Sequence, residues 1–280
     1  MPPSPVLSSV VSSVGSSAPV RLVWTPPIGV KVPQITLLFW VIKVATTGTG
    51  EAASDFLAAH NLLVAAAVGA AGLVAGLVWQ LRSRRFRPGV YWLAVSMVAV
   101  FGTMAADAVH VVLGVPYPVT SLGYALAVTG VFVLWYAAEG TLDIHSIRTR
   151  RREGFYWAAV LATFSLGTAV GDLSAFTLGL GYLASAVMYA VLIAVPAVGW
   201  WRFNLNPVVA FWSAYVLTRP LGASLADWFG KPAGRSGLGL GDGTVTVVAA
   251  LLIAALVAWT AKTQPRSASA GDSPTSRRGR

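Results

Sequence analysis

Four aspartates recur at a fixed distance from an aromatic–tryptophan pair. In each copy a glycine lies 10 residues and an aspartate 15 residues after the tryptophan. The copies read Phe39-Trp40…Gly50…Asp55, Tyr91-Trp92…Gly102…Asp107, Tyr156-Trp157…Gly167…Asp172 and Phe211-Trp212…Gly222…Asp227. Fixed spacing of this kind indicates an internal repeat. Each Asp lies in an apolar segment, where an ionisable side chain is costly and therefore suggests a function.

The first copy carries a longer polar stripe, in which Lys43, Thr47, Glu51 and Asp55 follow one another at i+4 spacing on one helix face. Carboxylates and hydroxyls form a hard-oxygen environment that suits Mg²⁺, Mn²⁺ or protons. Lys43 and Arg219 would offset part of the negative charge. These residues predict a path for a divalent cation or a proton, lined by Glu51, Asp55, Asp107, Asp172 and Asp227.

An architectural role explains the same residues without transport. The glycines would permit close helix approach, and the aspartates would pair with Lys43 and Arg219 inside the bundle. Thr47 would bond back to its own helix. His110, one turn beyond Asp107, is either a proton relay or a hydrogen-bonded histidine near the membrane interface. Both interpretations stay open at the level of sequence.

Composition indicates a polytopic membrane protein, because 56% of the residues are hydrophobic and only 11% are charged. The chain has no cysteine, which excludes disulfides and thiolate metal sites. Its three histidines, His60, His110 and His145, do not have the spacing of a zinc site or of paired haem ligands. We therefore expect no resident cofactor and no enzymatic activity.

The apolar segments predict an all-α fold of eight transmembrane helices, arranged as four parallel helical-hairpin repeats. The expected spans are 34–57, 61–81, 90–113, 119–138, 155–178, 181–201, 208–229 and 242–261. The membrane domain would cover 31–262, with repeats at 31–88, 89–153, 154–205 and 206–262. Residues 1–30 and 263–280 are expected to be disordered tails. The glycine-rich stretch 230–243 lacks a nucleotide-binding spacing and is expected to be a flexible outer loop.

The net charge of +10 is concentrated in short Arg-rich runs between apolar spans, chiefly at 82–87 and 148–152. The positive-inside rule explains these runs better than nucleic-acid binding does. It predicts that both termini are cytoplasmic and that the four signature helices, meaning those that carry the repeated motif, all run outward. Their aromatic pairs would then lie near the cytoplasmic interface of the bilayer.

The segment around Thr46-Thr47-Gly48-Thr49-Gly50-Glu51…Asp55 resembles a family of bacterial uncharacterised membrane-anchored proteins. That family is built from a repeat of unknown function with a Thr-Thr-x-Gly-Glu-x-x-x-Asp core, and this chain has one extra residue before Gly-Glu. The resemblance implies a bacterial inner-membrane protein with four repeats. The leading functional hypothesis is a small-cation or divalent-metal transporter; the alternative is a structural or regulatory membrane protein.

Overall fold

The computed structural model describes residues 31–263, and the predictions for the tails lie outside this range. Within it the chain is all-α, with eight helices and no strand. Their bounds are α1 Leu37–His60, α2 Leu62–Arg82, α3 Pro88–Asp107, α4 Tyr117–Glu139, α5 Arg150–Asp172, α6 Gly181–Phe203, α7 Pro207–Gly230 and α8 Asp242–Thr263. Two π-helical turns, η1 (Ala108–Val112) and η3 (Leu173–Thr177), extend α3 and α5. The eight predicted helices are therefore confirmed for the described residues.

Local signals fix where the four signature helices begin. The hydroxyls of Thr36 and Thr149 accept a hydrogen bond from a backbone amide in the first turn of α1 and of α5, respectively. Both bonds are 3.2 Å long and satisfy an amide that the helix cannot pair. Helices α3 and α7 begin instead with Pro88 and Pro207, whose missing N–H costs nothing at that position. The four helices thus begin at different distances before their tryptophans, from three residues in α1 to seven in α5.

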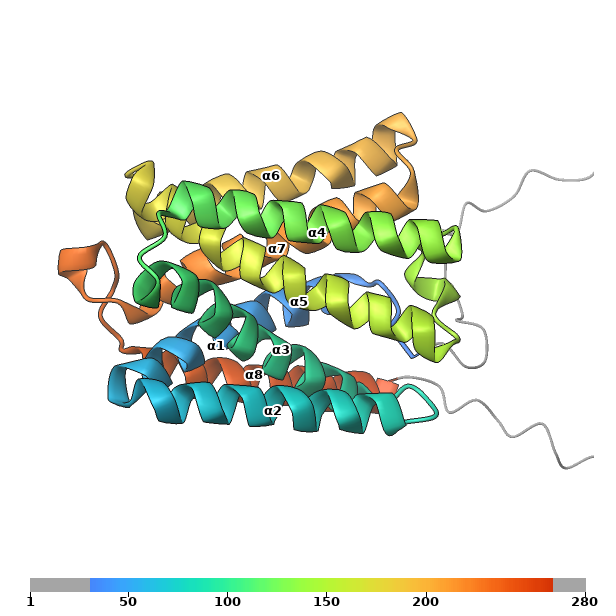
Figure 1. The fold of residues 1–280 in the computed structure, drawn as a ribbon, viewed down its shortest axis with the longest axis horizontal. Coiled ribbons are helices and arrows are strands. Elements are labelled where there is room, and N and C mark those ends of the chain that lie inside the picture. The colour runs from blue at the N-terminus through green and yellow to red at the C-terminus, as the bar shows by residue number, and fades with distance from the viewer. Residues whose placement is uncertain (1–30, 264–280) are drawn as a thin grey trace, which may run out of the picture.

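The signature helices α1, α3, α5 and α7 form a closed ring. They run in one direction, and the even-numbered helices return in the other (Figure 1). Helices α1 and α5 each contact both α3 and α7. The even-numbered helices lie outside the ring, with α2 mainly on α3, α4 on α5, α6 on α7 and α8 on α1. Each outer helix therefore packs mainly on the signature helix of the next repeat, and not on its predicted hairpin partner, which joins the four repeats into one body.

The repeated glycines are the points of closest approach within the ring. A Cβ added at any of the four would lie less than 3.0 Å from the next signature helix. The facing residue always lies seven positions after its own tryptophan: Gly50 faces Ala99, Gly102 faces Phe164, Gly167 faces Arg219 and Gly222 faces Thr47. The same contact made four times gives the ring approximate fourfold symmetry. The glycines thus serve close helix packing, as the architectural interpretation expected.

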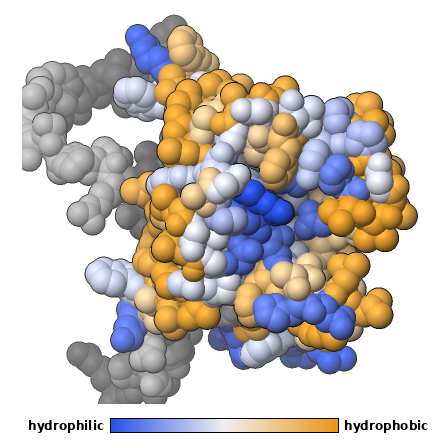
Figure 2. All heavy atoms as spheres, turned by 90° about the vertical axis from the view of Figure 1, so that its left-hand side faces the viewer, coloured by the Kyte–Doolittle hydropathy of each residue, from blue (hydrophilic) through white to orange (hydrophobic). Residues whose placement is uncertain are grey.

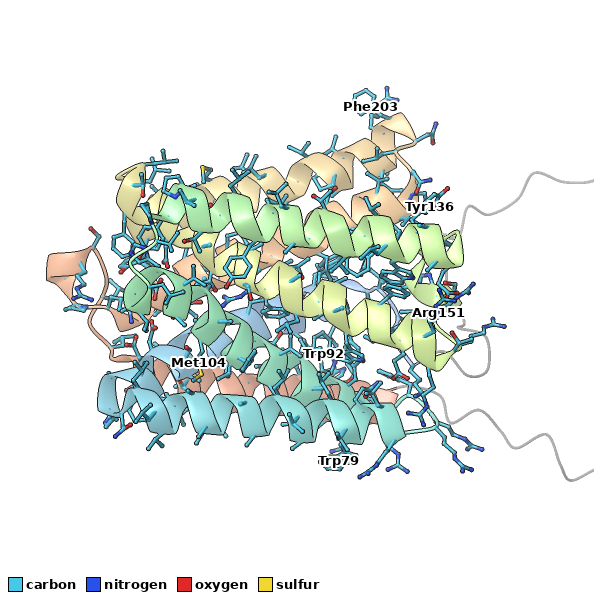
Figure 3. The ribbon with its side chains drawn as sticks, in the orientation of Figure 1. Trp79, Trp92, Met104, Tyr136, Arg151 and Phe203 are labelled. Carbon is cyan, nitrogen blue, oxygen red and sulfur yellow. The ribbon has the colours of Figure 1, made fainter. Side chains whose placement is uncertain are left out.

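The aromatic pairs form a second repeated layer, which we call the aromatic collar (residues 39, 40, 91, 92, 156, 157, 211 and 212). The first ring of each pair contacts the tryptophan of the next repeat. The centroid distances are 5.5 Å for Phe39–Trp92, 5.8 Å for Tyr91–Trp157, 6.2 Å for Tyr156–Trp212 and 5.7 Å for Phe211–Trp40. The rings of the collar pack on one another within the bundle, and their position near the cytoplasmic interface of the bilayer stays a prediction. Trp92 is 3% exposed, whereas Trp79 on the outer helix α2 is 53% exposed and points away from the ring (Figure 3).

The outer helices present an apolar surface. Their exposed side chains are mostly valine and leucine, such as Val191 on α6 and Leu251 on α8. By length and composition six of the described helices can cross a membrane; α1 and α7 are the other two. These two carry ionisable side chains that lie inside the ring or at its end, namely Lys43, Glu51, Asp55, Arg219 and Asp227. The chain is a multi-pass membrane protein whose apolar helices suit contact with lipid.

Candidate functional site

A pocket of about 490 Å³ lies at the end of the ring where the signature helices finish. Figure 2 looks onto this end and shows a hydrophilic recess framed by apolar side chains. All five acids predicted from the sequence line the pocket: Glu51, Asp55, Asp107, Asp172 and Asp227. The four aspartates meet because the parallel helices place the position 15 residues after each tryptophan at the same level, and Glu51 lies four residues before Asp55 on the same helix. The loops with the Arg-rich runs, among them Arg151, lie at the opposite end (Figure 3).

Carboxylates outnumber basic groups in this pocket. Lys231 and Arg235 line it, and Arg219 pairs with Glu51 from the side of the collar. Five carboxylates therefore face three cationic side chains. Asp107 and Asp172 have no hydrogen-bonded or ion-paired partner among residues 31–263. The pocket thus has an excess of negative charge that a cation would neutralise.

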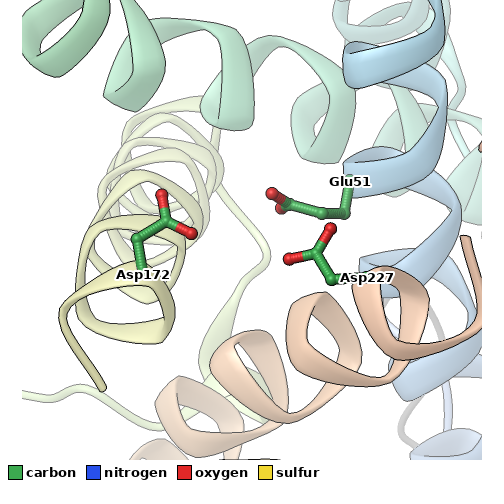
Figure 4. Close-up of side chains that lie close together, drawn as sticks. All are labelled: Glu51, Asp172 and Asp227. Atoms are coloured by element: carbon green, nitrogen blue, oxygen red, sulfur yellow. The ribbon is translucent and has the colours of Figure 1, made fainter. Parts of the chain in front are cut away.

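Three of the acids come especially close. Carboxylate oxygens of Glu51, Asp172 and Asp227 all lie within 4.8 Å of one another, and Figure 4 shows the three groups directed towards a common space. Glu51 and Asp227 are buried, whereas Asp172 is partly exposed. Oxygen ligands in this arrangement could hold Mg²⁺, Mn²⁺ or Ca²⁺. Asp55 and Asp107 line the same pocket but are not members of this group.

Glu51 also belongs to a buried network to which each repeat contributes one side chain. Arg219 Nη2 donates to Glu51 Oε2 at 2.7 Å and to Thr168 Oγ1 at 2.7 Å, and it also contacts Thr103 Oγ1. The two threonine hydroxyls lie 3.2 and 3.4 Å from the same Glu51 oxygen. Arg219 is 1% exposed and Glu51 3%. Arg219 therefore offsets negative charge as predicted, but it acts on Glu51 rather than on an aspartate.

Lys43 lies apart from all five acids. Its Nζ is 3.8 Å from the ring centroid of Phe164 and 4.1 Å from that of Tyr215, and it has no hydrogen-bond partner among the described residues. Lys43 belongs to the same stripe as Glu51 in the sequence, but two helical turns separate them, and aromatic rings surround it at this level. Lys43 thus contacts two aromatic rings and no carboxylate, so the expected pairing of Lys43 with the acids was wrong.

Thr47 and His110 also make structural contacts. Thr47 Oγ1 bonds to the carbonyl of Val44 at 2.7 Å and to that of Thr218 on α7 at 3.2 Å. His110 Nδ1 lies 2.7 Å from the carbonyl oxygen of Val115, and its ring stacks on Tyr117. Thr47 thus bonds back to its own helix, as its architectural interpretation expected, and His110 is hydrogen-bonded. Neither residue lines the pocket.

Lys231 sits at the pocket mouth, immediately after α7. Its Nζ contacts Asp55 at 2.5 Å, Asp242 at 2.9 Å and Asp227 at 3.9 Å. Burial alone lowers the pKa of Lys231, but Asp55 and Asp227 outweigh that effect and raise it well above its usual range. Lys231 is therefore a charged ammonium held by three carboxylates.

The glycine-rich loop that follows α7 holds this arrangement in place. The amides of residues 238–241 donate to carbonyls of residues 228–231 at 2.6 to 3.0 Å. Two glycines with positive φ, Gly239 (77°) and Gly241 (83°), allow the chain to fold back in this way. The expectation of a flexible loop was therefore wrong, because its backbone amides are paired with the end of α7. The loop brings Asp242 next to Lys231.

Three residues of the site were not predicted as site residues. Thr103 and Thr168 lie 11 residues after their tryptophans, at the position that Glu51 occupies in the first repeat. Aligning the four copies at that position would have revealed them. Lys231 had no such signal, because it lies outside the repeated motif and only the folded loop brings it to the acids.

Comparison with protein-family models finds the Repeat of Unknown Function (DUF347) at residues 38–86, 90–141, 155–206 and 210–265. Searches of the curated proteins and of the solved structures found no significant match. The four matched segments contain most of each signature helix and the outer helix that follows it, and together they cover most of the chain. The resemblance inferred from the first repeat is thereby confirmed. The chain belongs to the DUF347 family, whose repeat it carries four times.

Proposed function

We propose that this protein transports a small cation across the bacterial inner membrane and binds it in the acid-lined pocket. The observation that carries the proposal is the convergence of five carboxylates, from four parallel helices, on one pocket with only three basic side chains nearby. Ionisable groups at membrane depth usually mark a substrate or ion path. A divalent metal ion is one form of cargo that the group Glu51, Asp172 and Asp227 could coordinate.

The proposal includes an orientation and eight membrane spans. Helices α1 and α7 lie in a ring with α3 and α5 and run parallel to them, which supports membrane crossing by all eight helices (Figure 1). The Arg-rich loops lie at the collar end, so the positive-inside rule makes that end cytoplasmic. The pocket would then open to the outside. Release at the other side requires Arg219 to leave Glu51 and the collar to part.

Asp172 is the most informative residue to change, because it has no ion-pair partner whose loss could unfold the protein. We expect Asp172→Asn to lower cation flux at least about tenfold. The loss of one carboxylate that contributes about 1.4 kcal/mol to the binding free energy of the cation weakens its affinity by that factor. Flux would be measured in proteoliposomes with a panel of Mg²⁺, Mn²⁺, Na⁺ and alkylammonium ions.

The matched control is Asp143→Asn, which removes the same charge from the α4–α5 loop outside the pocket. It should retain wild-type flux. Equal flux of every panel cation through wild type and Asp172→Asn would refute the proposal.

An architectural role has independent support from the Arg219 network, to which all four repeats contribute. We assign that role to the network alone. A change at Glu51 should therefore lower both stability and flux, whereas a change at Asp172 should lower flux only.

A further inference from the structure

We propose that the preferred cargo is a small organic amine, best a linear diamine, rather than a bare metal ion. This inference rests on the proposed function and names the chemical class of the cation. It starts from the walls of the pocket, which are not those of a metal site. Besides the acids they include apolar and aromatic side chains, among them Met104, Val111, Tyr117, Phe176 and Tyr182.

The size of the pocket favours an organic ligand. Small-molecule sites typically measure about 300–1,000 Å³ and combine apolar walls with a few polar groups. The volume here is about 490 Å³. A metal ion would leave most of it to water, since one water molecule takes roughly 30 Å³. The carbon atoms of an amine would instead contact Val111 and Phe176. These side chains have no atom that could bind a metal ion.

Lys231 shows which chemical group the acids accept. Its side chain is a butyl chain ending in a primary ammonium, and that ammonium lies at 2.5 Å from Asp55 and 2.9 Å from Asp242. The pocket therefore already holds an alkylammonium supplied by the chain itself. An amine ligand would repeat this contact at the acids that Lys231 does not reach.

Those remaining acids indicate a ligand with two charges. Asp107 and Asp172 have no partner among the described residues, and carboxylates exceed basic side chains by two. Glu51 adds an oxygen, since among residues 31–263 its Oε2 accepts three hydrogen bonds and its Oε1 accepts none. The Glu51 side chain is almost fully buried, with an exposure of 3%. Ser54 also lines the pocket, and its buried hydroxyl has no partner among residues 31–263.

The rings around the pocket suit ammonium groups as well. Tyr117, Phe176 and Tyr182 pack together with centroid distances of 6.0 Å and 5.7 Å. Aromatic faces attract alkylammonium ions, most strongly where water is excluded. The two ammonium groups of a diamine would thus bind carboxylates, and its alkyl chain would contact the apolar and aromatic side chains of the pocket.

The test is calorimetric titration of the full-length protein in lipid nanodiscs. The probes are 1,5-diaminopentane, the neutral isostere 1,5-pentanediol, and Mn²⁺. We expect the diamine to bind and the diol not to bind. Asp172→Asn should weaken diamine binding at least about tenfold with an unchanged melting temperature, whereas Asp143→Asn should bind like wild type.

Two further variants separate the cargo classes. Phe176→Ser removes part of the apolar wall at a half-exposed position, so it should weaken diamine binding and leave Mn²⁺ binding unchanged. Lys231→Met removes a positive charge from the pocket mouth and leaves Asp55 and Asp242 without their ammonium partner, so it should strengthen diamine binding about tenfold or more.

Binding of Mn²⁺ without binding of the diamine would overturn this inference and leave the proposed cation transport standing. Binding of neither probe, together with no flux in proteoliposomes, would overturn both. Equal binding of the diamine and the diol would also overturn the inference, because the carboxylates would then play no part.

Discussion

Replacing Arg219 by methionine should destabilise the protein more than any single change in the pocket above it. The substitution removes the only cation that contacts Glu51 among the described residues, at 2.7 Å. It also removes the donor to Thr168. The carboxylate left behind is only 3% exposed. Removing one partner of a buried ion pair costs about 3–5 kcal/mol, because the other charge stays buried without compensation.

The size of this effect can be assigned to the pair with a double-mutant cycle. Methionine fills much of the volume of the arginine stem, so Arg219→Met keeps the packing against Gly167. In the double variant with Glu51→Met both charges of the pair are removed, so neither is left buried without its partner. The double variant should therefore lose less unfolding free energy than the two single variants lose together, by about 2 kcal/mol or more.

The assay is equilibrium unfolding in mixed detergent micelles, followed by tryptophan fluorescence. Arg151→Met is the matched control, since Arg151 is 66% exposed and pairs with Glu139 at 3.4 Å. A surface pair of this kind contributes about 0–1 kcal/mol. The reasoning fails if Arg219→Met costs no more than Arg151→Met, or if the double variant loses the full sum of the single losses.

Two further predictions concern the packing of the ring. Gly102→Ala should cost about 1–3 kcal/mol of unfolding free energy by overpacking, because a Cβ there lies 2.7 Å from that of Phe164. Gly130→Ala on α4, with no atom within 4 Å, should be neutral or gain up to about 1 kcal/mol, and the same unfolding assay compares the two. In the collar, Tyr91→Phe breaks the buried hydroxyl contact of 2.6 Å with Tyr156 and should cost about 1–2 kcal/mol. Equal melting temperatures for Tyr91→Phe and wild type would contradict this assignment.

The helices and the convergence of the acids were predictable because both depend on short-range or repeated information. Apolar run length locates a helix such as α2 to within a few residues. The motif spacing places Asp55 and its three equivalents at one level, provided that the signature helices are parallel. Neither inference needs to know which helix lies next to which.

The partners of the acids could not be predicted in the same way. Arg219 meets Glu51 across 168 residues of sequence, and the contact depends on α7 closing the ring against α1. Lys43 shares a helix face with Glu51, yet Phe164 and Tyr215 surround it instead. Periodicity along one helix specifies a face, whereas the neighbours of that face depend on the order of helices around the ring. That order is a tertiary property.

The differences between the four copies help to separate architecture from chemistry. Eleven residues after the tryptophan the copies have Glu51, Thr103, Thr168 and Ala223. Four glutamates at that level would repel one another in a buried site. A single glutamate, two hydroxyls and the guanidinium of Arg219 instead form a neutral, hydrogen-bonded layer.

The next level, 15 residues after the tryptophan, keeps an aspartate in all four copies. Here the chain does not neutralise the charge fully, because Lys231 and Arg235 are the only basic side chains that line the pocket. If the aspartates served the fold alone, hydroxyls would fill the same space at lower electrostatic cost, as they do at Thr103 and Thr168. A layer that retains uncompensated carboxylates is better explained by a cation that comes and goes. For this reason we propose that the aspartates of this level bind the cargo together with Oε1 of Glu51, whereas the hydrogen bonds between Arg219 and Oε2 of Glu51 contribute stability.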